Sequence, residues 1–131
     1  MELEDLISKL KQAFSKQEIK KAVLDQEWYS KNIETKIDST GFCYAACEII
    51  YRMTGGKERW KKYAISKDKW NDGGHCYLMD KKDNSILDIT SDQYLLNGID
   101  IPYHLGVAGG FRTKDFTKKA RLLAEMANIL S

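Results

Sequence analysis

The sequence predicts an α+β fold, and three observations support this class. Apolar side chains recur at helical spacing in the first half of the chain and again near its end. Between these regions, two short runs rich in aromatic and branched residues flank Lys81-Lys82-Asp83-Asn84, a pattern typical of a β-hairpin. Helices before and after a small antiparallel sheet define the α+β class. With 131 residues, the chain is expected to form one domain over residues 1–131.

Three helices are expected in the first half of the chain. Residues 2–14 carry apolar side chains at helical spacing. Ser15 followed by Glu18 is a capping-box pattern, and it predicts a second helix that buries Trp28. The polar stretch 29–38 is expected to form a loop between this second helix and the third.

The third helix, residues 42–53, is the most apolar of the chain. It follows Ser39-Thr40-Gly41, any one of which could cap it, and Gly55-Gly56 ends it. A small-residue patch in this helix permits the close approach of another element, which suggests a central position. The segment 57–64 is expected to form a short helix that turns its aromatic residues inward and leaves its lysines in water.

The second half of the chain supplies the sheet and a closing helix. A turn at 71–74 leads into the hairpin at 75–90. Glycines surround a short strand that ends at Phe111, and Thr113 can cap a last helix over residues 115–130.

The hairpin is expected to bring an imidazole and a carboxylate together. Side chains alternate between the two faces of a strand, so His75, Tyr77 and Met79 share one face. In a hairpin with a two- or four-residue loop, opposed residues have sequence numbers of opposite parity, which places Asp88 on the His75 face. The two side chains then lie opposite or diagonal to one another, within reach. A carboxylate on one ring nitrogen fixes the tautomer and leaves the other nitrogen free to act as a base.

Cys43 is the candidate nucleophile for this pair. It falls in the first turn of the third helix, where unpaired backbone N–H groups and the helix dipole favour a thiolate. The same amides can donate hydrogen bonds to the oxyanion that forms when a thiolate attacks an amide or ester carbonyl. Cys43, His75 and Asp88 then supply nucleophile, base and orienting carboxylate, the arrangement of cysteine acyl-transfer enzymes.

A cysteine at a helix N-terminus, followed by histidine and aspartate on adjacent strands, resembles the circular core of the papain-like cysteine peptidase superfamily. Its transglutaminase-like and NlpC-type branches share this order. The small bacterial YunG-like group looks similar at Gly74-His75, at Asp88-Ile89-Thr90 and at Gln93-Tyr94. The resemblance covers residues 40–94 and does not account for the first two helices or the last one.

The resemblance implies a papain-like half-barrel behind a helix, with peptidase, deamidase or transamidase chemistry. Papain-type enzymes place a glutamine a few residues before the cysteine as an oxyanion donor, whereas this chain has Lys36-Ile37-Asp38 there. A side-chain donor must therefore come from the segment before Cys43 or from elsewhere. The residues expected to bind substrate are Thr40, Trp70, Gly74 and Gln93.

Other roles are open for several of these residues. Cys47 is expected to be a packing residue, and His104 is the competing imidazole. The imidazole–carboxylate pair could serve stability alone. Cys43, Cys47, Cys76 and His75 could form a zinc set, but His75 and Cys76 point to opposite faces of a strand. The rival function is a non-catalytic papain-like module whose cleft holds a peptide or a partner protein.

Composition and charge exclude several function classes. The net charge is +2, with 21 basic and 19 acidic residues mixed along the chain, so neither nucleic acid nor a membrane is expected as a partner. Three cysteines, an odd number behind an acidic amphipathic N-terminus, suggest free thiols in the cytoplasm. The expected enzyme is a thiol hydrolase or transferase with a protein or peptide substrate and without a metal or another cofactor.

Overall fold

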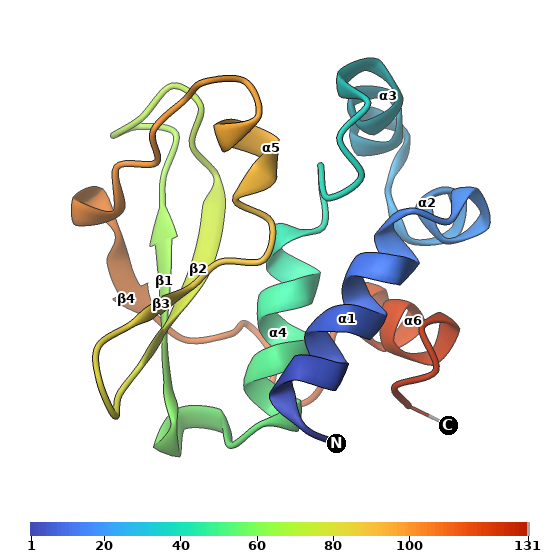
Figure 1. The fold of residues 1–131 in the computed structure, drawn as a ribbon. Helices are drawn as coiled ribbons and strands as arrows, with labels where there is room; N and C mark the ends of the chain where they lie inside the picture. The colour runs from blue at the N-terminus through green and yellow to red at the C-terminus, as the bar shows by residue number, and fades with distance from the viewer. Residues whose placement is uncertain (131) are drawn as a thin grey trace.

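The computed structural model describes residues 1–130, which form a four-stranded antiparallel sheet covered by helices (Figure 1). The helices are α1 (Leu3–Phe14), α2 (Gln17–Val23), α3 (Gln26–Thr35), α4 (Cys43–Met53), α5 (Asp92–Leu95) and α6 (Lys118–Met126). The strands are β1 (Trp60–Ile65), β2 (His75–Asp80), β3 (Ile86–Leu87) and β4 (Val107–Gly109), with 3-10 turns η1 (Gly56–Glu58) and η2 (Tyr103–Leu105). The strand order is β3-β2-β1-β4, and the predicted α+β class is confirmed.

Helix α4 lies between the sheet and the other long helices, as Figure 1 shows. It packs on β2 with one side and on α1 and α6 with the other. The main core forms at this interface and includes Trp60, Cys76 and Leu78 from the sheet. The central position expected for the most apolar helix is therefore confirmed. Within residues 1–130, no helix has both the length and the apolar character that crossing a membrane requires.

A second, smaller core lies on the opposite face of the sheet. Ile65, Tyr77 and Ile101 are its buried residues, and aromatic side chains from β1, from the loop before β2, and from α5 and η2 pack around them. Tyr77 stacks on Tyr63 with ring centroids 5.6 Å apart. This core matters for the site because β2 alternates between the two cores, and His75 shares the face of Tyr77.

The hairpin has the register that its sequence predicts. Leu78 pairs with Leu87 and Met79 with Ile86, so opposed residues have opposite parity. The amide of Asp80 donates to the carbonyl of Ser85, 2.8 Å away, and closes the turn. The chain leaves β3 at Leu87, and Asp88 follows on the His75 face.

The predicted loop at 29–38 is wrong, because most of it is helix α3. The Asp25 side chain caps this helix by accepting from the amide of Trp28, 3.0 Å away, and Lys36 ends it in the left-handed conformation. The buried side of α3 is polar: Asn32 is fully buried and donates to the carbonyls of Asp38 and Thr40. The helix is therefore held by a cap and by hydrogen bonds, which an apolar periodicity does not reveal.

The predicted helix at 57–64 is also wrong. After η1 the chain forms β1, which pairs with β2 on one side and with β4 on the other. Trp60 and Tyr63 lie three residues apart, a spacing that suits one helix face. On the strand they point to opposite faces, Trp60 into the main core and Tyr63 toward the second core.

Three predicted helix caps differ as well. The cap residue of α4 is Phe42, which follows the expected Ser39-Thr40-Gly41 and makes no side-chain hydrogen bond to the helix. Ser15 ends α1 and donates to the carbonyl of Gln12, so the capping box with Glu18 does not form. The last helix begins later than expected, because Thr117 and not Thr113 accepts from an amide of its first turn.

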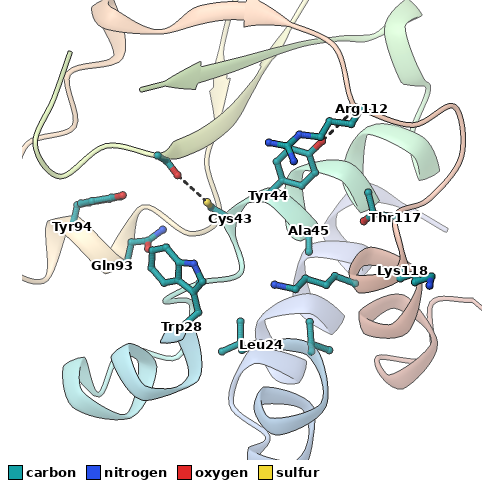
Figure 2. A pocket seen from close by; sticks show the side chains of 14 residues that line it. Leu24, Trp28, Cys43, Tyr44, Ala45, Gln93, Tyr94, Arg112, Thr117 and Lys118 are labelled. Carbon is teal, nitrogen blue, oxygen red and sulfur yellow. Dashed lines mark hydrogen bonds between the residues drawn. The ribbon is translucent and has the colours of Figure 1, made fainter. Parts of the chain in front are cut away.

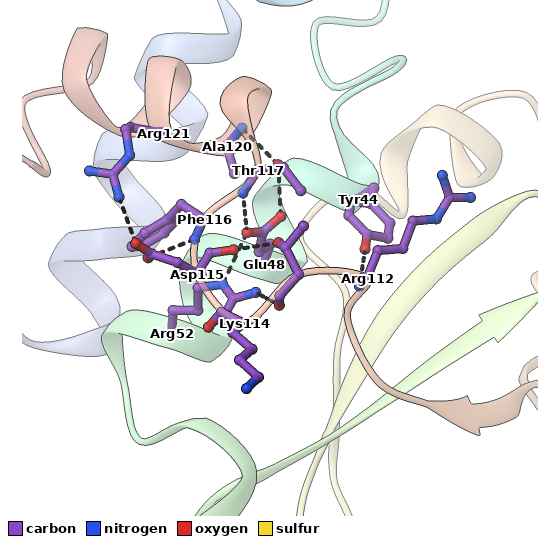
Figure 3. Close-up of polar contacts among 11 residues, drawn as sticks. Tyr44, Glu48, Arg52, Arg112, Lys114, Asp115, Phe116, Thr117, Ala120 and Arg121 are labelled. Carbon is purple, nitrogen blue, oxygen red and sulfur yellow. Dashed lines mark hydrogen bonds and ion pairs between the residues drawn. The ribbon is translucent and has the colours of Figure 1, made fainter.

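A buried acid ties the chain segment before α6 to the central helix (Figure 3). Glu48 is fully buried on α4 and forms an ion pair with Arg52, 3.0 Å away. Its carboxylate also accepts from the amide and the hydroxyl of Thr117, at 2.8 and 2.9 Å. Arg52 in turn donates to the carbonyls of Thr113 and Lys114. These contacts fix the segment that leads into α6.

Replacing Glu48 with alanine should lower the free energy of unfolding by about 3–5 kcal/mol, because Arg52 and two donors of Thr117 lose their buried partner. Glu48→Gln should have a smaller effect, since the amide retains one acceptor. Urea unfolding of each variant measures this, with Glu34→Ala on the exposed side of α3 as the control, expected within about 0.5 kcal/mol of wild type. A Glu48→Ala variant as stable as this control would contradict the anchoring role.

Candidate active site

Helix α4 begins at Cys43, which places the thiol at the N-terminal end of the central helix. Phe42 precedes it as the cap residue without a side-chain hydrogen bond, so the first amides of the helix have no capping side chain. The Cys43 side chain is half-buried, and its sulfur lies 3.7 Å from the carbonyl oxygen of Gly74 (Figure 2). The thiol of Cys43 thus meets the chain immediately before β2.

A turn of two glycines sets the start of β2. A Cβ atom on Gly73 would lie 2.5 Å from the carbonyl oxygen of Ser66, so the turn has no room for a larger residue. Gly74 has a φ of +86°, in the left-handed region that favours glycine, and its amide donates to the carbonyl of Ile65. The turn therefore determines where His75 enters the sheet.

His75, Asp88 and Tyr103 form a buried hydrogen-bonded group. Nε2 of His75 lies 2.6 Å from Oδ2 of Asp88, as the hairpin register predicts. The hydroxyl of Tyr103 donates to the same oxygen, 2.7 Å away. The side chains of His75 and Asp88 are 0% and 5% exposed. Two short hydrogen bonds fix the buried carboxylate of Asp88, and this carboxylate fixes the orientation of the His75 ring.

The other ring nitrogen of His75 faces Cys43. Nδ1 is buried and has no hydrogen-bond partner within residues 1–130. Burial lowers the pKa of His75, but the hydrogen bond to Asp88 and then the interaction with the Cys43 side chain outweigh it and raise the pKa to about 9. At neutral pH the imidazole is therefore protonated. A protonated imidazole next to a thiol is the partner that stabilises a thiolate.

Helix α5 carries Gln93 to the same place. Ser39, before α4, donates to the carboxylate of Asp92, and the hydroxyl of Tyr94 donates to the carbonyl of Asp72, 3.0 Å away. These contacts fix the residues on both sides of Gln93. Nε2 of Gln93 is buried without a hydrogen-bond partner within the described chain. Figure 2 shows the Gln93 side chain next to Cys43, where an unpaired donor can serve a substrate oxygen.

A cleft of about 420 Å³ opens beside the thiol (Figure 2). Cys43, Gly74 and Gln93 are among its lining residues. The apolar part of the lining consists of Val23, Leu24, Trp28 and Ala45. The charged part consists of Arg112, Lys118 and Lys119. A second hollow of about 490 Å³ lies on the His75 side, and it shares Gly74, Tyr44 and Arg112 with the first.

The structure places the other candidate residues away from the cleft lining. Thr40 is buried, and its hydroxyl shares a hydrogen bond of 3.0 Å with Thr35. Trp70 packs against Tyr94, with ring centroids 4.9 Å apart, at the second core. His104 is exposed on η2. Of the four residues expected to bind substrate, Gly74 and Gln93 are therefore the two that lie beside the thiol.

The other two cysteines lie in the main core. Cys47 is buried, and its hydrogen bond to Cys76, together with its burial, raises the pKa of the Cys47 thiol well above its usual range. A thiol in that environment stays protonated and unreactive. Within residues 1–130, the structure brings no three or more histidine, cysteine, aspartate or glutamate side chains together as a metal site.

Two residues of the site were missed at the sequence level. Tyr103 contacts Asp88 from η2, and Arg112 reaches the cleft from the segment after β4. Both lie in stretches without hydrophobic periodicity, so nothing local in the sequence indicates that they approach the site. For Tyr103, the only indication in the sequence is that an aromatic residue follows Pro102, a pattern that is common in surface loops.

Comparisons of the chain with protein-family models, with curated proteins and with solved structures found no match. The structure by itself establishes the α+β class.

Proposed function

We propose that the protein is a cysteine-dependent acyl-transfer enzyme that acts on a carboxamide, peptide or isopeptide bond through a thioester on Cys43. The observation that supports this most directly is the state of His75. One ring nitrogen is held by Asp88 at 2.6 Å, and the other is buried, unpaired within residues 1–130 and turned to Cys43. A structural histidine would have both nitrogens satisfied.

The chemistry follows from this arrangement. The Cys43 thiolate attacks the carbonyl carbon, and the electron pair of the C=O bond moves to the oxygen. The oxyanion accepts from the backbone amide of Cys43 and from Nε2 of Gln93. The carbonyl re-forms, the C–N bond breaks, and His75 gives its proton to the departing amine. Water or an acceptor amine then attacks the thioester while His75 takes its proton, and the Cys43 thiolate is released.

The chain resembles papain-like enzymes of the transglutaminase-like and NlpC-type branches in the order of these residues, cysteine first and then histidine and aspartate. Its substrate is a peptide or protein, its chemistry requires no cofactor, and its place of action is the cytoplasm. Tyr103 acts through Asp88. The hydrogen bond from its hydroxyl fixes the orientation of the Asp88 carboxylate toward His75. Tyr103 is therefore a positioning residue.

Acylation by p-nitrophenyl acetate tests the proposal without knowledge of the natural substrate. The wild-type protein should release a burst of one p-nitrophenolate per chain, and peptide mapping should find the acetyl group on Cys43. Cys43→Ala should show no burst, whereas Cys47→Ala should retain it, because the Cys47 thiol is buried in the core. A wild-type protein without a burst, together with tight binding of a peptide in the cleft, would favour the non-catalytic binding module instead.

A further inference from the structure

The cleft beside Cys43 combines an apolar floor with an excess of positive charge. Three cations line it, and no aspartate or glutamate is among the described residues of its lining. Lys119 is compensated by Asp25, 3.3 Å away. Arg112 and Lys118 form no salt bridge with any residue in 1–130.

Two buried carboxylates near the site are already engaged: Asp88 accepts from His75 and from Tyr103, and Glu48 accepts from Arg52 and from Thr117. Asp92 accepts from Ser39, and Asp72 is exposed to water and outside the cleft lining. The two uncompensated cations therefore leave a net positive potential in a concave, partly apolar space, where field strength is greater than on an open surface.

The cations are held at the cleft by the fold. The backbone amide of Arg112 donates to the hydroxyl of Tyr44, the neighbour of Cys43 on α4, 3.4 Å away (Figure 3). Lys118 is the first residue of α6, directly after Thr117, which Glu48 anchors. Arg112 lines both hollows, the cleft that contains Cys43 and the one that contains His75.

We infer that the enzyme selects peptide-like substrates that carry a carboxylate next to an apolar side chain. This inference rests on the proposed function and names its substrate class. The guanidinium of Arg112 can bind a carboxylate with two parallel hydrogen bonds, and Lys118 adds a second charge on the same cleft. The apolar side chain of the substrate fills the space between Leu24, Trp28 and Ala45.

Two matched electrophiles test the inference: chloroacetyl-leucyl-glutamyl amide and chloroacetyl-leucyl-glutaminyl amide, which differ only in a carboxylate. Intact-mass kinetics give the second-order rate of Cys43 alkylation by each. Wild-type protein should react about 3- to 10-fold faster with the glutamyl probe, and added salt should reduce this preference. The double variant Arg112→Gln/Lys118→Gln should lose it. Arg112→Lys should retain a part of it, because the charge remains and the two-pronged geometry does not.

Lys57→Gln is the matched control. It removes one positive charge at η1, beyond the far end of the eleven-residue helix α4 and therefore about 16 Å or more from Cys43. It should keep the full preference, and thermal melts should show every variant folded. Rapid but equal reaction with both probes, or a preference that survives the double variant, would overturn the inference and leave the proposed function standing. Reaction no faster than that of an unstructured cysteine peptide would overturn both.

Discussion

Replacement of His75 with alanine should slow the acylation of Cys43 by p-nitrophenyl acetate by about 10- to 30-fold at neutral pH, because an ordinary thiol is only a few per cent ionised there. The variant loses the cation that stabilises the thiolate, while p-nitrophenolate leaves without a proton from His75. Because the pKa of His75 is raised to about 9, the wild-type imidazole carries its proton throughout the neutral range. The acylation rate of the variant should therefore fall furthest below that of wild type at the pH values where a free thiol is protonated.

Asp88→Ala should reduce the acylation rate less than His75→Ala does, since the imidazole is still present although its orientation is no longer fixed. The expected order of acylation rates is wild type, then Asp88→Ala, then His75→Ala, with Cys43→Ala inactive. His104→Ala is the matched control, because it removes an exposed imidazole, and its rate should equal that of wild type. Circular-dichroism melts must show all variants folded. Equal rates for His75→Ala and wild type would contradict the triad.

Gln93→Ala should reduce the acylation rate by about 10²- to 10³-fold, the loss typical of one oxyanion-hole donor. Its buried Nε2 has no partner within residues 1–130, so its hydrogen bond is available to the substrate oxygen alone. Alkylation by iodoacetamide passes through no oxyanion, and its rate should therefore be the same in Gln93→Ala and in wild type. The ratio of the two rates isolates the oxyanion contribution from any change in thiol reactivity.

Gln12→Ala, an exposed glutamine on α1, serves as the control for this ratio. Gln93→Asn shortens the side chain by one methylene and should recover only a small part of the acylation rate, because the donor no longer reaches. If Gln93→Ala slowed acylation and alkylation equally, the residue would act by positioning the thiol or His75, and its role as an oxyanion donor would be wrong.

The pairing of His75 with Asp88 was predictable from the sequence because strand alternation and hairpin parity are local rules. A hairpin with a four-residue loop has only one way to arrange its faces, and the observed register follows it. The position of Cys43 in the first turn of a helix was predictable for the same reason. The meeting of Cys43 with His75 depends on how α4 packs on β2, which the sequence suggests only through the chemistry of the two residues.

The errors have a common physical origin in long-range contacts. Helix α3 lacks an apolar stripe, because its buried position is Asn32, whose partners are backbone carbonyls. Strand β1 carries aromatic residues at a spacing that also fits a helix, and only its pairing with β2 and β4 decides between the two. Arg112 and Lys118 reach the cleft because Glu48 anchors the segment between them, a contact that no local pattern encodes.

The central claim is that Cys43 and His75 act as a thiolate–imidazolium pair. Iodoacetamide labelling of Cys43 across a series of pH values, read by intact mass in wild type and in His75→Ala, tests it most directly. We predict that wild-type Cys43 is labelled faster than Cys43 of His75→Ala at neutral pH, and that the difference narrows at alkaline pH, where an ordinary thiol ionises without a cationic partner. Identical profiles in the two folded proteins would contradict the pairing and, with it, the assignment of an acyl-transfer enzyme.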